Sequence, residues 1–393
     1  MTKLKTIFFA ASALALLGVS ACKDPSDGTG GGNIVPPEAP FVEGGASLIL
    51  SRDRLDIKVT VTTADGTSVT VEGCTETTLI SGIETVLHAK GSLVILKGNI
   101  KELDCRWNKL TALNVQGCTA LERLDCDINQ LTTLNVQGLS ALKELYCGDN
   151  RLTALNVQGC TALQELYCHD NQLTALSVQG LTALERLYCD DNQLTALNVQ
   201  GFTALQWLYC DSNQLTELNV QGLTALERLY CYGNQLTELN VQGCTALQRL
   251  HCQTNQLAAL NVQGLTALQT LRCYNNQLTE LNAQGLTALQ KLYCGSNQLT
   301  ALNVQGLTAL KELDCCNNRL TADAFKKLFD DLPVRADSDN AWCVLYTEKT
   351  GVTEGNHTDF TVPLDLADTF NKAKTVKNWK MHKLNGSGNF FEI

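Results

Sequence analysis

A cysteine recurs every 21 residues along the middle of the chain, from Cys105 to Cys315. The eleven are Cys105, Cys126, Cys147, Cys168, Cys189, Cys210, Cys231, Cys252, Cys273, Cys294 and Cys315. An asparagine follows three residues after each of them, from Asn108 to Asn318. A fixed period of this length indicates one small structural unit stacked on copies of itself. Such a stack builds a surface more readily than a catalytic pocket, so the period favours binding over catalysis.

Residues 163–173 show the spacing of one unit, L-x-x-L-x-C-x-x-N-x-L. Counted from the first leucine, the cysteine is the sixth residue of the unit and the asparagine the ninth. The spacing resembles the leucine-rich repeat, with cysteine at a place where that family usually has leucine. Eleven copies cover residues 100–320, and the first begins with Ile100. The resemblance implies a leucine-rich repeat solenoid, an α/β-type superhelix with a parallel β-sheet on its concave face.

The alternation of residues within a unit predicts which side chains are buried. Leu166 and Cys168 are two residues apart, so on a strand both point into the stack, and Tyr167 between them points outward. The asparagine amide can satisfy backbone groups where the chain turns. The connection back to the next strand is too short for a full helix. We therefore expect a mostly β solenoid, with 3₁₀ turns or short extended pieces on the convex side.

Three roles are open for the cysteines: buried apolar side chain, disulfide partner, or metal ligand. A second core position of the repeats separates them, because cysteine alternates there with leucine and phenylalanine. Its residues are Cys118, Leu139, Cys160, Leu181, Phe202, Leu223, Cys244, Leu265, Leu286 and Leu307. The exchange indicates packing by free thiols. Neighbouring strands about 4.8 Å apart leave disulfides open, whereas a straight column does not converge on a metal.

The outward positions of the repeats carry the candidate binding residues. Aspartates dominate the early units, tyrosines the middle ones, and basic residues such as Arg228, His251 and Lys291 the later ones. Rigid aromatic side chains on an exposed sheet are typical anchors of binding interfaces. The predicted ligand-binding residues are Tyr167, Tyr188, Trp207, Tyr209, Tyr230, Tyr232, Arg249 and Arg272. The alternative is that tyrosine is only a good strand former copied by duplication. Trp207 argues against it, because its copies hold Glu, Arg, Thr or Lys.

Three aspartates at the eighth position, Asp149, Asp170 and Asp191, would stack like charges about 5 Å apart. Such a column is either solvated or binds a cation. Solvation is the simpler interpretation, and a calcium ion held by Asp149, Asp170 and Asp191 is the alternative. No other metal site and no cofactor are expected.

Both ends of the solenoid need a cap, because a stack exposes its core at each end. Residues 41–99 predict a β N-terminal cap with strands at 47–50, 56–62, 69–72 and 93–96, and a hairpin turn at Ala64-Asp65-Gly66. Residues 321–393 predict a mixed α/β C-terminal cap. Its expected elements are helices at 321–329 and 365–377 and strands at 342–346 and 379–384. Cys74 and Cys343 are expected in the core of these caps.

The first 40 residues predict where the protein is located. Residues 1–21 have a positive start, with Lys3 and Lys5, and a short apolar stretch, which is typical of an export signal. Val19-Ser20-Ala21-Cys22 resembles a bacterial lipobox, which implies cleavage before Cys22 and lipidation of Cys22. The alternative is an ordinary signal peptide with a chance cysteine. Residues 22–40 are rich in Gly and Pro and predict the lipidated end and a flexible tether.

Composition and motifs restrict the function. With 30 basic and 40 acidic residues the chain lacks the charge expected of a nucleic-acid-binding protein. None of its five histidines has the spacing of a metal site or catalytic triad, so we expect no enzyme. The chain resembles leucine-rich repeat lipoproteins and adhesins of Gram-negative anaerobes such as the Bacteroidota. That resemblance implies a protein of the outer membrane or cell surface, held only by its lipid, that binds host or bacterial surface proteins. The alternative is a glycan-binding component of nutrient capture.

Overall fold

The computed structural model describes residues 38–393. The predicted signal peptide at 1–21, the lipidation site at Cys22 and residues 23–37 of the tether lie outside the described residues. Ala39 is buried in a small cluster with Ile49 and Ala112, and its carbonyl oxygen accepts a hydrogen bond from Asn114 Nδ2 at 3.1 Å. Ala39, which the sequence assigns to the tether, therefore packs against the folded part.

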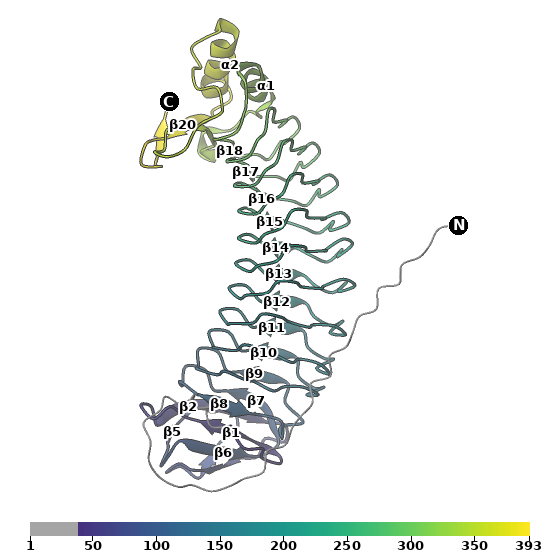
Figure 1. Cartoon of the computed structure of the whole chain (residues 1–393), viewed down its shortest axis with the longest axis vertical. Coiled ribbons are helices and arrows are strands. Elements are labelled where there is room, and N and C mark those ends of the chain that lie inside the picture. Colours follow the sequence, from purple (N-terminus) through teal and green to yellow (C-terminus); the bar gives the residue numbers. More distant parts are fainter. Residues whose placement is uncertain (1–37) are drawn as a thin grey trace, which may run out of the picture. The chain divides into compact units, whose positions relative to one another are not determined.

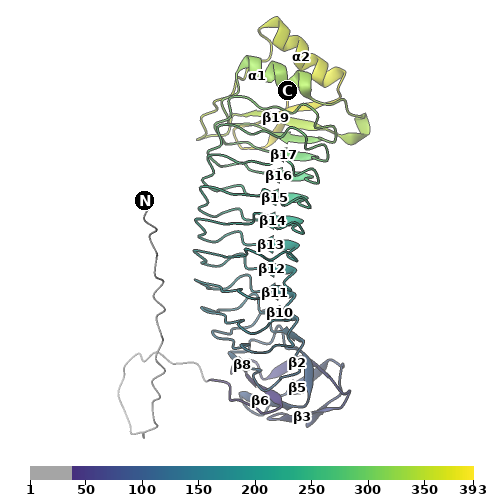
Figure 2. The same ribbon diagram turned by 90° about the vertical axis from the view of Figure 1, so that its right-hand side faces the viewer.

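Two β-sheets organise the described residues (Figure 1). The longer sheet has 16 strands, in the order β21-β20-β19-β18-β17-β16-β15-β14-β13-β12-β11-β10-β9-β7-β2-β5. Eleven of these strands, one for each repeat, are β7 (Ile100–Asp104), β9 (Arg123–Asp125), β10 (Glu144–Tyr146), β11 (Glu165–Tyr167), β12 (Arg186–Tyr188), β13 (Trp207–Tyr209), β14 (Arg228–Tyr230), β15 (Arg249–His251), β16 (Thr270–Arg272), β17 (Lys291–Tyr293) and β18 (Glu312–Asp314). They lie side by side in sequence order, as Figure 2 shows. The predicted fold, a leucine-rich repeat solenoid with a parallel sheet, is confirmed.

The register of the sheet follows from the 21-residue period. Leu145 lies opposite Leu166, and Leu166 opposite Leu187, so equivalent residues form straight columns. The fourth and sixth residues of each unit point inward: Leu166 and Cys168 are both 0% exposed. Tyr167 between them is half-buried on the outward surface. The period-2 alternation therefore holds throughout the stack.

The asparagine at the ninth position stabilises each turn after a strand. Asn192 Nδ2 donates to the carbonyl oxygens of Cys168 (2.9 Å), Cys189 (3.3 Å) and Asp190 (3.0 Å). Its Oδ1 accepts from the backbone N–H of Leu173 at 2.9 Å. One side-chain amide thus satisfies backbone groups of two consecutive units, which would otherwise be buried without partners.

The segments that return to the next strand contain no helix. Single turns closed by bonds between residues three apart follow each other, as in Leu139 N–H to Val136 O (3.1 Å) and Leu142 N–H to Leu139 O (3.0 Å). Short extended pieces pair through parallel bridges such as Asn135 with Asn156. The expected extended pieces and tight turns are present, and within residues 100–320 no continuous 3₁₀ helix forms.

The N-terminal cap contains β1 (Gly45–Ile49), β2 (Asp56–Thr63), β3 (Val69–Glu72), β4 (Thr78–Leu79), β5 (Thr85–His88) and β6 (Leu93–Lys97). β2 pairs with β7 and β5 and so extends the long sheet. The second sheet has the order β4-β3-β6-β1-β8, where β8 (Ala112–Asn114) comes from the first repeat. The expected hairpin at residues 64–66 is wrong: the chain turns there, but β2 pairs with β5 and β7 whereas β3 pairs with β4 and β6, so the two strands belong to different sheets.

The C-terminal cap contains α1 (Ala322–Asp331), a 3₁₀ turn (Asp337–Asp339), β19 (Trp342–Thr347), α2 (Leu364–Thr375), β20 (Lys380–Leu384) and β21 (Phe390–Glu392). β19 and β20 continue the parallel sheet, and β21 pairs antiparallel with β20. Phe325 and Phe329 of α1 pack against Phe360 and against Phe370 of α2. These rings cover the last repeat, as a solenoid end requires. Neither helix of residues 38–393 is long and apolar enough to cross a membrane.

Candidate functional site

The strand face is the outward surface of strands β7 and β9–β18, formed by the third, fifth and seventh residues of each unit. It corresponds to the concave face expected from the sequence. On β12 to β15 the third position holds Arg186, Trp207, Arg228 and Arg249 in register. All four are half-buried or exposed, so this column is available to a ligand.

The fifth position carries a continuous stack of aromatic rings. Ring centres are 4.7 Å apart for Tyr146 and Tyr167, 4.3 Å for Tyr167 and Tyr188, and 4.2 Å for Tyr188 and Tyr209. Tyr209 and Tyr230 are 4.3 Å apart, with planes at 9°. Tyr167 and Tyr188 are tilted by 53°, whereas Tyr188, Tyr209 and Tyr230 are nearly parallel, so the neighbours of Tyr209 cover both of its faces. Tyr209 therefore presents only its ring edge and hydroxyl group to the surface.

His251 extends this stack by one strand. Its ring centre lies 4.1 Å from that of Tyr230, with the planes at 5°. Burial, together with Arg272 and Arg249, lowers the pKa of His251 to about 4. The imidazole is therefore neutral near pH 7 and acts as a sixth flat ring, a role that sequence reasoning missed by classing His251 with the basic residues.

Trp207 lies between two arginines. The guanidinium carbon of Arg186 is 4.3 Å from the ring centre, and that of Arg228 is 4.4 Å from it. Cation–π stacking of this kind is favourable and holds planar groups in place. Neither Arg186 nor Arg228 is among the ligand-binding residues predicted from the sequence. The signal that identifies them is the period itself, because residues 21 before and after Trp207 lie beside it.

Ion pairs neutralise both ends of the third-position column. Arg123 pairs with Glu144 at 3.0 Å, Arg186 with Glu165 at 2.6 Å, and Lys291 with Glu312 at 2.8 Å. Arg228 and Arg249 of this column, and Arg272 at the fifth position of the next strand, form no ion pair with any residue of 38–393. Three neighbouring strands, β14 to β16, therefore present uncompensated positive charge.

At the seventh position, three of the early and middle strands carry aspartates: Asp127, Asp190 and Asp211. Burial raises the pKa of Asp127 and of Asp190 to about 6, and that of Asp211 to about 7. Asp211 is only 3% exposed. The middle of the strand face is thus divided across its width: arginines flank Trp207 along one edge of β12 to β15, aromatic rings lie in the middle, and Asp190 and Asp211 lie along the other edge on β12 and β13.

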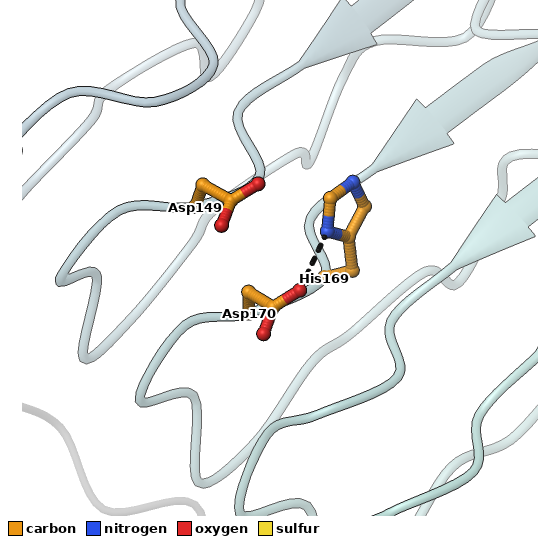
Figure 3. Close-up of side chains that lie close together, drawn as sticks. All are labelled: Asp149, His169 and Asp170. Carbon is orange, nitrogen blue, oxygen red and sulfur yellow. Dashed lines mark hydrogen bonds and ion pairs between the residues drawn. The ribbon is translucent and has the colours of Figure 1, made fainter.

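The eighth-position aspartates do not form one site. Asp149 and Asp170 lie with His169, whose Nδ1 is 3.1 Å from an Asp170 carboxylate oxygen (Figure 3). Asp191 belongs to a second group, with Asp190 and Asp211. Asp149, Asp170 and Asp191 are exposed at left-handed turn positions, with φ of 49°, 49° and 48°. The structure therefore separates the three residues of the calcium hypothesis into two groups.

The imidazole of His169 has its place because the preceding unit holds a glycine. A Cβ built on Gly148 would come within 2.6 Å of the His169 ring.

The other predicted residues lie on the strand face as expected by position: Tyr232 at the seventh, Arg249 at the third and Arg272 at the fifth. The guanidinium carbon of Arg272 lies 5.2 Å from the ring centre of Tyr293.

A second concave feature lies away from the strands. A shallow hollow of about 710 Å³ is lined by residues of four consecutive return segments, among them Asn198, Gln200, Glu217 and Asn240. It contains repeated amides and glutamates and no aromatic side chain. Its open shape and uniform lining offer no anchor of the kind found beside Trp207.

All 17 cysteines of residues 38–393 are free and buried. Those of the column, such as Cys189, are 0% exposed, and burial raises the pKa of the Cys189 thiol far above its usual range. Cys74 and Cys343 lie in the core of the two caps. A protonated, inaccessible thiol is a poor nucleophile and a poor metal ligand, so the column serves packing.

Comparison with known proteins agrees with this architecture. Residues 266–307 match the family model for leucine-rich repeats in two copies. InlJ from Listeria monocytogenes, whose functional domain includes a cysteine ladder, is 36% identical with a TM-score of 0.54; the match covers 56% of this chain and 50% of that one. The chain therefore spans about half of the compared InlJ chain. No curated protein matches the chain significantly in sequence.

Two further structures share the fold at lower identity. The internalin InlF from Listeria monocytogenes is 24% identical, with a TM-score of 0.53, over 70% of this chain and 87% of that one. YopM from Yersinia pestis, a leucine-rich effector protein, is 23% identical, with a TM-score of 0.52, over 67% and 74%. The chain thus carries leucine-rich repeats and folds as their solenoid, and its structural neighbours include bacterial leucine-rich repeat proteins. Such proteins are generally non-catalytic recognition scaffolds.

Proposed function

We propose that this protein is an exported, lipid-anchored recognition or adhesion protein that binds host or bacterial surface proteins through its strand face. The observation that carries the proposal is the Arg186–Trp207–Arg228 sandwich beside an ordered row of aromatic rings. Tryptophan, tyrosine and arginine dominate the energetics of protein interfaces. Because stacking already orders these side chains, binding would immobilise them at little entropic cost.

Protein ligands fit this surface better than the glycans of the alternative proposal. A sugar ring stacks on an exposed aromatic face, but both faces of Trp207 are covered by arginines and those of Tyr209 by Tyr188 and Tyr230. The surface offers ring edges, hydroxyl groups and guanidinium groups instead. These are suited to the mixed polar and apolar surface of a protein.

The proposed location rests on the first residues of the sequence. A signal peptide at 1–21 and a lipid on Cys22 would place the protein on the outer membrane or cell surface, in contact with the membrane only through its anchor. The likeness to bacterial internalins favours an exported protein. Replacing Cys22 by serine should release the protein from the membrane fraction of the producing cells; retention there would contradict lipidation at Cys22.

The binding proposal is tested by capture from solubilised surface proteins and, in parallel, on a glycan array. The test variant is Trp207→Ala with Tyr209→Ala. The matched control is Trp107→Asn, because Trp107 is 62% exposed in a turn and seven of the ten equivalent positions hold Asn, Asp or Ser. We expect the control to capture the same proteins as the wild type and the double variant to lose them. Full retention by the double variant would refute the proposal, and loss of glycan binding alone would favour the alternative.

A further inference from the structure

We propose that the ligand of the strand face is an acidic protein segment, which places its carboxylates along Arg228, Arg249 and Arg272. The inference rests on the proposed function and specifies the chemistry of its partner. Arginine binds carboxylate groups through two parallel hydrogen bonds, which makes it the preferred residue for recognising them.

The strand face carries a local excess of positive charge on β14 to β16. The chain has 30 basic and 40 acidic residues, so a positive surface runs against its overall composition. On this face the other basic residues have partners: Arg123, Arg186 and Lys291 all pair with glutamates. Arg228, Arg249 and Arg272, on three successive strands, have none among residues 38–393. Three unpaired arginines in a row repel each other, and an anionic ligand would remove that repulsion.

Three buried donors of the strand face lack a hydrogen-bond acceptor within residues 38–393: Nε1 of Trp207, Nε of Arg186 and Nε of Arg272. Trp207 and Arg186 lie on the arginine edge, and Arg272 lies in the adjacent middle column. The donors of this part of the face therefore lack acceptor atoms, and an ionised carboxylate carries only acceptors.

The opposite edge of the strand face favours a protein segment over a uniform polyanion. Along the opposite edge, Asp190 Oδ1 and Gln253 Oε1 are buried acceptors that have no donor within residues 38–393. Asp211 lies on the same edge. A nucleic acid or a sulfated glycan would bring negative charge to these carboxylates as well. A protein segment can place acidic side chains on the arginine edge and N–H donors on the aspartate edge.

The test is selection of random displayed peptides on the immobilised full chain. The test variant, Arg228→Gln with Arg249→Gln, is compared with a control, Arg151→Gln with Arg319→Gln, that removes the same charge outside the strands. Arg151 and Arg319 are exposed at the tenth position, where eight other units already hold glutamine. A third variant, Arg228→Lys with Arg249→Lys, keeps the positive charge but changes the side chains. Comparing it with the glutamine variant separates the effect of losing charge from the effect of altered packing.

We expect the wild type, the control and the lysine variant to enrich peptides rich in aspartate and glutamate. Binding of those peptides should weaken about tenfold in the glutamine variant and should weaken with added salt. Enriched peptides without acidic excess would overturn the inference. So would equal binding to the glutamine variant, or equally tight binding of heparin or single-stranded DNA. If peptides of any composition bind and Trp207→Ala with Tyr209→Ala abolishes that binding, the proposed function stands even where this inference falls.

Discussion

The guanidinium group of Arg228 stacks on the indole of Trp207, 4.4 Å from its ring centre, from the next strand of the sheet. Arg186 covers the other face of the same ring. One aromatic side chain therefore separates two positive charges and holds both at fixed positions on the strand face. This arrangement arises only once in the eleven units, because only Trp207 breaks the pattern of charged or polar residues at the third position.

Replacing Trp207 by threonine, the residue of the equivalent Thr270, should lower the free energy of unfolding by about 1–2 kcal/mol through loss of two cation–π contacts. Urea unfolding followed by circular dichroism measures the change. Trp107→Asn is the control and should change stability by less than about 0.5 kcal/mol, as is usual for exposed sites. Equal effects of the two substitutions would show that the arginine contacts contribute nothing to stability.

Asn192→Ala should destabilise the fold by about 3 kcal/mol or more, because it leaves several buried backbone groups without partners, at about 1–3 kcal/mol each. Asn198 provides the comparison: it is exposed, and its side chain accepts one bond, from Gln200 N–H at 3.0 Å. Asn198→Ala should cost less than about 1 kcal/mol. Chemical denaturation of both variants tests the difference, and similar losses would contradict the role given to the ninth-position asparagine.

Ionisation of Asp211 should lower the stability of the protein as pH rises from about 4 to 7. Burial raises the pKa of Asp211 from 3.8 to about 7 in the folded state, so the folded protein binds more protons than the unfolded chain between these values. One pKa unit corresponds to about 1.4 kcal/mol, which sets an upper limit near 4 kcal/mol for this group.

His251 acts in the opposite direction, since its pKa is lowered and its contribution to stability is lost as pH falls from 6.5 towards 4. The Asp211→Asn variant isolates the aspartate. Its gain in stability over the wild type should be larger at pH 7.5 than at pH 5, measured by urea unfolding at both values. A gain independent of pH would show that Asp211 titrates normally.

The cysteines should be unreactive until the protein unfolds. A thiol reagent should modify none of the 17 cysteines of residues 38–393 in the native state at early times, and all of them in denaturant without reductant. The measurement is a colorimetric thiol count under both conditions. A much lower count after unfolding would indicate disulfides between neighbouring units, the alternative that strand spacing leaves open.

The repeat fold could be predicted because one period defines every column of side chains. Leu166, Cys168 and Asn171 have the same surroundings as their copies, so the spacing of a single unit gives the burial and turn of all eleven. The caps were less predictable, because their strands pair with partners distant in sequence; β2 pairs with β7 rather than β3.

The sequence predicts which columns the residues of the candidate site occupy, but not which of their side chains contact each other. The sequence places Tyr209 and Tyr230 side by side, yet it does not show that their ring faces cover each other. It also does not show that His251 joins the rings as a neutral group, because its pKa depends on burial, on Arg272 of the next strand and on Arg249 of its own strand. These properties arise from side-chain rotamers and solvent exclusion, which a period in the sequence does not specify.

The central claim is that ligands bind to the strand face and not to the hollow between the return segments. A photo-crosslinking amino acid placed at Thr270, on the strand face, or at Gln200, in the hollow, tests it directly. Each variant is irradiated with solubilised surface proteins and examined for cross-linked products. The account predicts products from position 270 and none from position 200. Products from position 200 alone, or from neither position, would contradict it.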